Sequence, residues 1–594
     1  MTKLTFHSFV CPVLVLLSFV GLASAATAAD QVPSDRRLPP QVLAYVRVSN
    51  VPELKARWKK TSLGKLGQEK ELAEFWSEVE KQIDQLSDKI KEHVGVGLTD
   101  IVALPQGEVA VAVVQLPGEK LSLAVFLDGG DNDETVSKLL AKGAEAAEEQ
   151  GVKKTTEEFE GTELIIHTRQ KGDENEQDKD TAPQRIVYFR KGTMVVGGSD
   201  AATLKAILTR WDGKHEETFA ETSVYRQLVA ACRDEQNEER PALAWFIDPI
   251  GLVKGVVTST PRAATPQVAL ALGVLPTLGF DKFKAVGGTV DLATGEFDTI
   301  TRTLVYIDSP PTGVLNIFQF PGINQSPPGW VSAESSAYFG VNWDLTKAVN
   351  TVESLVDMFQ GPGTFKKYLD QFAEQEEFGK LHIRKDLLDH LSGRVHVVTD
   401  TPDAKNPESQ RLLVAIETKN AAALKKTLAA ISKLDGFPGK VRTFQGETVL
   451  EFGSLTGGDE DGDGNSKMGV TVARDNLMFA SNITLLEQVL RTGDDQDSLA
   501  NLPAYQRLAK KFPAVTSMIS FQRDDTQIQT LYELLRSGDA ASLLPHSDDV
   551  TIDFSKLPEF EVIRKYLSPS AGYMRPDKLG LLIVGFTLKS EKDD

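Results

Sequence analysis

Among the residues that could do chemistry, an acidic run at 459–465 has the spacing of a metal site. Asp459, Asp461 and Asp463 fall where a helix-loop-helix calcium loop has its first three oxygen ligands, and Gly464 takes the place of its turn glycine. The twelfth position of such a loop supplies a bidentate glutamate, but here it is Val470, and the flanks are predicted strands. Two interpretations stay open, a weak calcium site and a solvated hairpin loop, and we favour the loop.

Five residues between 382 and 396 could form a metal or acid–base cluster: His382, Asp386, Asp389, His390 and His396. Imidazole and carboxylate groups are common zinc ligands and common general acids and bases. Asp386, Asp389 and His390 belong to a short segment that is predicted to be amphipathic, whereas His396 follows a glycine turn and lies on the next predicted strand. We interpret these histidines as packing or surface residues, with a hydrolase or metal enzyme as the alternative.

Two further side chains are of nucleophile type. Cys232 is the only cysteine after residue 25 and follows Leu228 by one predicted helical turn, as a small buried hydrophobic residue would. Ser199 follows Gly198, but the second glycine of a nucleophile elbow is missing, and Ser199-Asp200 at a helix start is typical of capping. The sequence has no phosphate loop, dinucleotide fingerprint, Cys-x-x-Cys or His-Glu-x-x-His motif. We therefore predict no catalytic residue, no cofactor and no enzymatic activity.

The elements that must position these residues occur twice. Residues 159–165 read Phe-Glu-Gly-Thr-Glu-Leu-Ile, and residues 444–450 read Phe-Gln-Gly-Glu-Thr-Val-Leu. Ala44-Tyr45 recurs as Ala337-Tyr338, and Gly107-Glu108-Val109 recurs as Gly393-Arg394-Val395. The matches keep their order along the chain, which indicates a tandem duplication. We predict a first repeat at 38–308, a proline- and glycine-rich linker at 309–330 and a second repeat at 331–590.

Within each repeat, tight turns join short apolar strands, and amphipathic helices lie between the hairpins. This pattern predicts the α+β class, with two tandem copies of a largely antiparallel sheet unit and helices packed on it. The duplication also allows an internal comparison, in which His390 corresponds to Leu104, His396 to Ala110 and His167 to Phe452. Since a residue present for packing can be exchanged for an apolar one, these pairs favour the packing interpretation of the histidines.

Four short motifs mark a resemblance. They are the Leu38-Pro39 leader, the Ala-Tyr-x-x-Val strand at 44–48, the Phe-x-Gly hairpin and the helix start at Ser199-Asp200. Together with the two-fold pattern they resemble exported bacterial proteins that are catalogued only as a domain of unknown function. The resemblance implies export and a two-copy architecture, and it carries no reaction, ligand or functional residue.

The amino terminus has the pattern of a signal peptide. Lys3 precedes an apolar run at 9–22, which is short for a membrane span, and Ala23-Ser24-Ala25 fits the cleavage rule. We expect residues 1–25 to be removed near Ala25, export to the periplasm or the extracellular space, and no transmembrane helix in the mature chain. Cys232 alone then remains, so no intramolecular disulfide can form.

Charge and length limit the partners. A chain of 594 residues is too long to form a single hydrophobic core. Its formal charge of −19 repels nucleic acid and disfavours binding to anionic membrane surfaces. Our leading hypothesis is an exported non-enzymatic protein, a binding or structural scaffold of the cell envelope with an unknown protein or envelope partner. One alternative is a small-ligand or lipid carrier with a cavity between sheet and helices near Trp76, Trp211 and Trp245. The other alternative is the uncharacterised hydrolase or metal enzyme.

Overall fold

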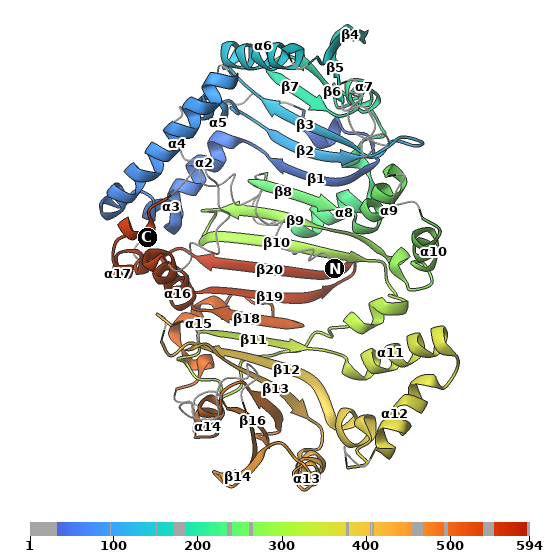
Figure 1. The fold of residues 1–594 in the computed structure, drawn as a ribbon, viewed down its shortest axis with the longest axis vertical. Helices are drawn as coiled ribbons and strands as arrows, with labels where there is room; N and C mark the ends of the chain where they lie inside the picture. Colours follow the sequence, from blue (N-terminus) through green and yellow to red (C-terminus); the bar gives the residue numbers. More distant parts are fainter. Residues whose placement is uncertain are drawn as a thin grey trace. The chain divides into compact units, whose positions relative to one another are not determined.

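The structure is a computed structural model, drawn in Figure 1. Contacts between Cα atoms divide the chain into two compact units. Unit 1 comprises Met1–Ala269, Ala285–Gly295 and Ala541–Pro558, and unit 2 comprises Leu270–Lys284, Glu296–Ala540 and Glu559–Asp594. The residues that the structure describes are 32–94, 97–149, 151–169, 185–233, 240–260, 265–375, 379–403, 405–406, 409–453, 467–491, 497–538 and 552–590.

Unit 1 is built on an antiparallel sheet whose described strands follow the order β9-β8-β1-β2-β3-β7-β6-β5-β4. Apolar side chains alternate with less buried ones, as along Val109–Val114, and this gives the sheet one face for packing. The bounds are β1 Val42–Val48, β2 Val109–Val114, β3 Ser122–Asp128, β4 Lys153–Phe159, β5 Thr162–Thr168, β6 Arg185–Lys191, β7 Met194–Gly198, β8 Leu243–Ile247 and β9 Phe283–Leu292.

The helices of unit 1 begin where the sequence provides caps. The side chain of Asn50 accepts from the backbone of Glu53 at the start of α2, and Asp248 caps α9 in the same way. The bounds are α2 Val51–Lys60, α3 Ser62–Leu66, α4 Ala73–Val94, α5 Leu98–Ala103, α6 Asp133–Glu149, α7 Ala201–Leu208, α8 Ser223–Cys232 and α9 Pro249–Ser259. A further helix, α10, spans Pro266–Val274.

Unit 2 repeats this plan. Its described strands follow the order β10-β20-β19-β18-β11-β12-β13-β17-β16-β15-β14, with every pair antiparallel. The bounds are β10 Phe297–Ile307, β11 Ala337–Asn342, β12 Leu391–Asp400, β13 Arg411–Thr418, β14 Lys440–Phe444, β15 Glu447–Phe452, β16 Met468–Ala473, β17 Asn476–Ala480, β18 Met518–Gln522, β19 Ser570–Asp577 and β20 Gly580–Leu588.

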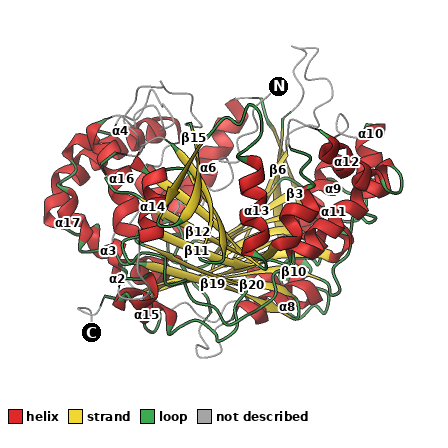
Figure 2. Ribbon diagram, turned by 90° about the horizontal axis from the view of Figure 1, so that it is seen from below, coloured by secondary structure: helices red, strands yellow, loops and turns green. Residues whose placement is uncertain are grey.

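The helices of unit 2 pack on this sheet. The core beneath α13 joins Leu424 of the helix to Leu391, Val472 and Leu477 of three strands. Figure 2 shows α13 and α14 with the strands, which they contact at β13, β15, β16 and β17. The bounds are α11 Leu345–Gln360, α12 Thr364–Glu374, α13 Ala421–Ile431, α14 Ile483–Arg491, α15 Pro503–Ala509, α16 Asp524–Ser537 and α17 Phe560–Arg564. None of the helices within the described ranges is long and apolar enough to cross a membrane.

The strand orders confirm the α+β class and the two copies. From β9 to β4 in unit 1 and from β19 to β14 in unit 2, every strand has a counterpart at the same place in the order. The register agrees as well, because Arg47 lies opposite Ala110 in unit 1 and Gly340 lies opposite His396 in unit 2. The strand β10, although part of the first repeat in sequence, belongs to unit 2, where it pairs with β20.

The segment at 309–330 is held against unit 2 rather than extended between two bodies. Residues Gly313–Phe318 form the 3-10 helix η8, and the indole of Trp343 donates to the carbonyl of Ile317 at 2.6 Å. Asn342 donates to the carbonyl of Pro321, and Ile323 forms a β-bridge with Thr516. Residues 326–330, at the end of this segment, line the pocket described next.

Candidate functional site

A pocket of about 820 Å³ opens in unit 2 at one end of β12, β13 and β17. Its size falls within the roughly 300–1,000 Å³ of small-molecule sites in proteins. Nine of its 14 lining residues are polar or charged. The lining comprises residues 326–330, Arg394, His396, Glu417, residues 474–476, Ser498, Ala500 and Asn501.

Residues 326–330 form one wall, and backbone hydrogen bonds fix it. The amide of Val331 donates to Pro328, and the amide of Leu499 donates to Val331 at 2.8 Å. The guanidinium of Arg394 donates through Nη2 to the carbonyl of Ser326 at 3.1 Å. Trp330 is buried, and its ring meets the imidazole of His396 edge-to-face at a centroid distance of 5.7 Å. The wall is therefore a rigid part of unit 2.

His396 lies at the bottom of the pocket in its neutral form. The imidazole is 2% exposed, and burial, with a smaller contribution from Arg394, lowers its pKa to about 3. Its Nδ1 lies 2.9 Å from the hydroxyl of Tyr338, which has no other hydrogen-bond acceptor in the described part of the chain. Since burial also raises the pKa of Tyr338, the hydroxyl keeps its proton and donates to Nδ1. The ring proton of His396 is then on Nε2, which is left as a donor for the pocket.

Two buried polar atoms of the lining have no hydrogen-bond partner. Asn476 is 5% exposed, and its Nδ2 donates to the carbonyl of Arg474 at 2.6 Å, which fixes the orientation of the amide. Its Oδ1 is buried without a donor, and Nε of Arg394 is buried without an acceptor. Each such atom costs about 1–3 kcal/mol unless something else satisfies it. Two residues of the lining thus carry a buried, unsatisfied polar atom, an acceptor on Asn476 and a donor on Arg394.

The remaining charged residues of the lining come from a strained turn and from β13. Arg474 and Asp475 join β16 to β17 with φ values of 51° and 55°, a left-handed conformation that favours asparagine and glycine. Glu417 lies opposite Asn476 and accepts from the hydroxyl of Ser392 at 3.2 Å. With Arg394 and Arg474 against Glu417 and Asp475, the formal charge of the lining is zero while His396 is neutral.

Unit 1 carries a different set of residues at the equivalent strand positions. Counting along the paired strands, Arg394 corresponds to Glu108, His396 to Ala110, Glu417 to Asp128 and Asn476 to Met194. In each unit, one residue of a cross-strand pair is large and the other is small. In unit 1 the large residue is Arg47 on β1, opposite Ala110, whereas in unit 2 it is His396 on β12, opposite Gly340. The exchange keeps the packed volume similar and replaces a buried cation with a buried imidazole.

In unit 1 these positions form an internal ionic cluster. Arg47 pairs with Asp35 at 3.2 Å, and the hydroxyl of Tyr225 donates to the same carboxylate at 3.3 Å. The amide of Ser34 donates to Glu108 at 2.9 Å, while burial raises the pKa of Glu108. The guanidinium of Arg37 lies 3.9 Å from the ring centroid of Trp211. The polar groups of unit 1 therefore pair with one another in part, since Oδ1 of Asp35 and Nε of Arg47 stay buried without a partner, whereas those of unit 2 line a pocket.

The five residues that could form a metal or acid–base cluster do not come together. His382 caps the turn of π-helix Ile383–Leu387, and its Nε2 lies 3.6 Å from Asp370. Asp386 accepts from the amide of His382, and His390 ends the short helix Leu388–His390. His396 instead contacts Tyr338 and Trp330. Within the described ranges no group of three or more His, Cys, Asp or Glu side chains could hold a metal ion.

Ser199 and Asp200 serve the start of α7. Asp200 is its N-cap and accepts from the amide of Thr203 at 3.0 Å, while Ser199 accepts from the amide of Leu123. In unit 2, Asn482 and Ser481 make the corresponding contacts with Leu485 and Leu412. Cys232 is fully buried on α8, with Sγ 3.9 Å from the carbonyl of Gly287.

The other residues singled out from the sequence lie in separate surroundings. Trp76 packs on Phe75, Trp211 contacts Phe189 and Arg37, and Trp245 is on β8. His167 stacks on Tyr188. The acidic run with Asp459, Asp461 and Asp463 and the signal-peptide segment at 1–25 lie outside the described residues.

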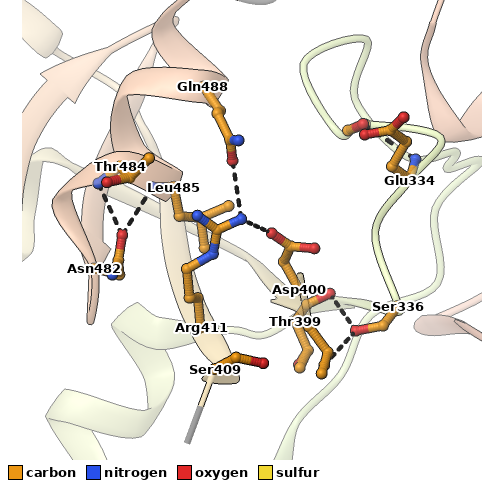
Figure 3. A network of polar contacts seen from close by, with 12 residues as sticks. Glu334, Ser336, Thr399, Asp400, Ser409, Arg411, Asn482, Thr484, Leu485 and Gln488 are labelled. Atoms are coloured by element: carbon orange, nitrogen blue, oxygen red, sulfur yellow. Dashed lines mark hydrogen bonds and ion pairs between the residues drawn. The ribbon is translucent and has the colours of Figure 1, made fainter. Parts of the chain in front are cut away.

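A second polar network lies where β12 ends and β13 begins, at the end of these strands away from the pocket. Arg411 lies across from Asp400 and forms an ion pair with it, and Nη2 also donates to Gln488 of α14 at 3.2 Å (Figure 3). Both partners of the ion pair are mostly buried. This network ties α14 to the sheet away from the pocket.

The pocket residues other than His396 were not predicted as a site. They come from five separate segments of the chain, and one of these segments has the composition of a linker. The internal comparison contained a usable indication, since Ala110 and Met194 of the first repeat become His396 and Asn476 in the second. Buried apolar positions that turn polar in one copy indicate either a new internal partner or a ligand.

Comparison with known proteins gives no function for this pocket. No curated protein and no solved structure matches the chain. Residues 362–531, which include Arg394, His396, Glu417 and Asn476, match the family model described as "Protein of unknown function (DUF3352)".

Proposed function

We propose that this protein is an exported, non-enzymatic binding protein of the cell envelope whose second repeat holds a small polar ligand in the pocket beside residues 326–330. The observation that carries the proposal is Asn476, which is 5% exposed and lines the pocket with an unpartnered Oδ1. A buried amide oxygen without a donor is costly, and a bound molecule that donates to it removes that cost.

Two further observations support binding. Arg474 and Asp475 hold left-handed conformations at the pocket, and strained backbone of this kind concentrates at ligand sites. The wall at 326–330 is held by backbone hydrogen bonds, so little ordering entropy is lost when a ligand binds. Export is supported by Lys3, the apolar run at 9–22 and the small residues before residue 26.

Among the carrier alternatives, a small polar ligand suits the pocket better than a lipid. A lipid site needs a mainly apolar wall, whereas most of the lining residues here are polar or charged.

The test is a thermal-shift screen of the mature protein against a library of small polar compounds, together with native mass spectrometry of protein purified from its own cells. We expect at least one compound to raise the melting temperature. Replacement of Asn476 by Met, the residue at the equivalent position of the first repeat, should reduce that rise because it removes the acceptor.

Thr471→Val is the matched control. Thr471 is fully buried on the neighbouring strand and donates to the carbonyl of Thr448, but it does not line the pocket. This variant should lose about 1 kcal/mol of stability and keep the ligand-induced rise. A protein that carries no ligand from its cells and responds to no compound, or a response that Asn476→Met leaves intact, would contradict the proposal.

A further inference from the structure

We propose that the ligand of this pocket is a neutral polyhydroxylated molecule, a mono- or disaccharide or a sugar-like polyol. The inference rests on the proposed function and adds the chemical class of the ligand. Three properties of the lining carry it: its charge balance, its mixture of donors and acceptors, and its single large aromatic wall.

The charge of the lining favours a neutral ligand. Two guanidinium groups, those of Arg394 and Arg474, are matched by the carboxylates of Glu417 and Asp475, and His396 is buried in its neutral form. A pocket for an anion carries a net positive charge, because the ligand loses its hydration on entry and needs a counter-charge. A pocket for a cation needs the reverse. With a formal charge of zero, the lining provides no net counter-charge for either an anion or a cation.

The unsatisfied polar atoms call for a ligand group that both donates and accepts. Asn476 Oδ1 needs a donor, and Arg394 Nε needs an acceptor. His396 offers Nε2–H, because its Nδ1 is occupied by the hydroxyl of Tyr338. A hydroxyl group has one hydrogen to donate and two lone pairs, so a row of hydroxyls satisfies such an alternating lining. A carboxylate would satisfy Arg394 and His396 but would leave the amide oxygen of Asn476 without a donor.

The aromatic wall fits the less polar surface of a sugar ring. Trp330 lines the pocket, and the edge-to-face contact with His396 holds its indole in place. Aromatic rings offer a rigid apolar surface at little entropic cost. Side chains with planar polar groups, here Asn476, Arg394 and Glu417, line the same pocket. The pocket volume of about 820 Å³ leaves room for one or two sugar rings together with bridging water.

The experiment is isothermal titration of the mature protein with named probes. The neutral probes are glucose, N-acetylglucosamine, cellobiose and maltose, the anionic probe is glucuronate and the zwitterionic probe is alanine. We expect saturable binding of at least one neutral sugar, and glucuronate should bind at least tenfold more weakly than glucose or not at all. Asn476→Met and His396→Ala, which restore the residue types of the first repeat, should each weaken binding about tenfold through the loss of one hydrogen bond.

Thr471→Val should bind the same sugar with unchanged affinity, which separates loss of the site from loss of stability. Tighter binding of glucuronate or alanine than of any neutral sugar, weakened by Asn476→Met, would overturn the ligand class and leave the proposed function standing. A pocket that holds water only, with no titration by any probe and no ligand in native mass spectrometry, would overturn both. Sugar binding that Asn476→Met does not weaken would place the sugar elsewhere and refute the inference.

Discussion

The neutral imidazole of His396 makes the stability of unit 2 depend on pH in a way that can be calculated. In the unfolded chain a histidine has a pKa near 6.5, whereas burial lowers the pKa of folded His396 to about 3. Between these two pKa values His396 binds a proton in the unfolded state but not in the folded state. The free energy of unfolding therefore falls as the pH drops below about 6.5. From pH 7 to pH 5 the loss attributable to this group is roughly 2 kcal/mol.

The perturbation that isolates this effect is His396→Gln, which stays neutral and can still accept from the hydroxyl of Tyr338. Urea unfolding of both proteins at pH 7 and pH 5 gives the stability change of each. The wild-type protein should lose roughly 2 kcal/mol more than the variant over this interval. Other titrating groups are common to both proteins and cancel. Equal losses in the two proteins would mean that His396 is protonated in the folded state, and the neutral Nε2 donor assigned to the pocket would then be wrong.

The remaining predictions concern the turn at Asp475, the close approach of Gly340 to Tyr338 and the N-cap of α14. Asp475→Gly relieves a left-handed conformation of a residue with a Cβ atom, so it should stabilise the protein by about 0.5–1 kcal/mol in urea unfolding while weakening ligand binding; a destabilised variant would show that the turn is not strained. Gly340→Ala would place a Cβ atom 2.4 Å from the hydroxyl of Tyr338 and should cost about 1–3 kcal/mol, and retention of full stability would contradict the packing beneath His396. Asn482→Ala removes the cap of α14 and should cost about 1 kcal/mol without changing ligand affinity, whereas a changed affinity would place the cap in the site.

Much of the architecture follows from local patterns in the sequence. The hairpin turns and alternating apolar residues predict antiparallel strands, and the recurrence of Ala44-Tyr45 at Ala337-Tyr338 predicts that β1 and β11 take the same place in their sheets. The register then follows, because a shift by one residue would turn Tyr338 out of the core, where it is 1% exposed. Local rules suffice here since each one agrees with the global fold.

The pocket could not be predicted in the same way, because it depends on which segments meet across the sheet. Residues 326–330 have the composition of a linker, and only the contacts with Arg394 and Leu499 show that they form a wall. The turn at Arg474-Asp475 lacks the glycine or asparagine that normally marks a left-handed turn, so its conformation is not visible in the residue types. Sequence proximity also misleads, since His382 and His390 lie near His396 in the chain but have other neighbours in the fold.

The comparison of the two repeats shows how one copy could acquire a site without loss of fold. In the first copy, Arg47 forms an ion pair with Asp35, and Met194 occupies the position of Asn476. In the second copy, Gly340 replaces the arginine, and the freed volume is taken by His396 on the neighbouring strand. The hydroxyl of Tyr338 then turns to the imidazole, whereas its counterpart Tyr45 bonds to Ser34. Because each exchange keeps the sheet packed, the polarity of the lining can change while the strand order stays the same.

The same comparison argues that the polar groups of the second copy were retained for a ligand rather than for stability. Asn476 without a partner costs free energy that the methionine of the first copy does not cost, and the strained turn at Asp475 adds to that cost. Both residues line one pocket, beside the unpartnered Nε of Arg394. The proposed ligand would account for these features together, because it would supply partners for the buried polar atoms of the lining.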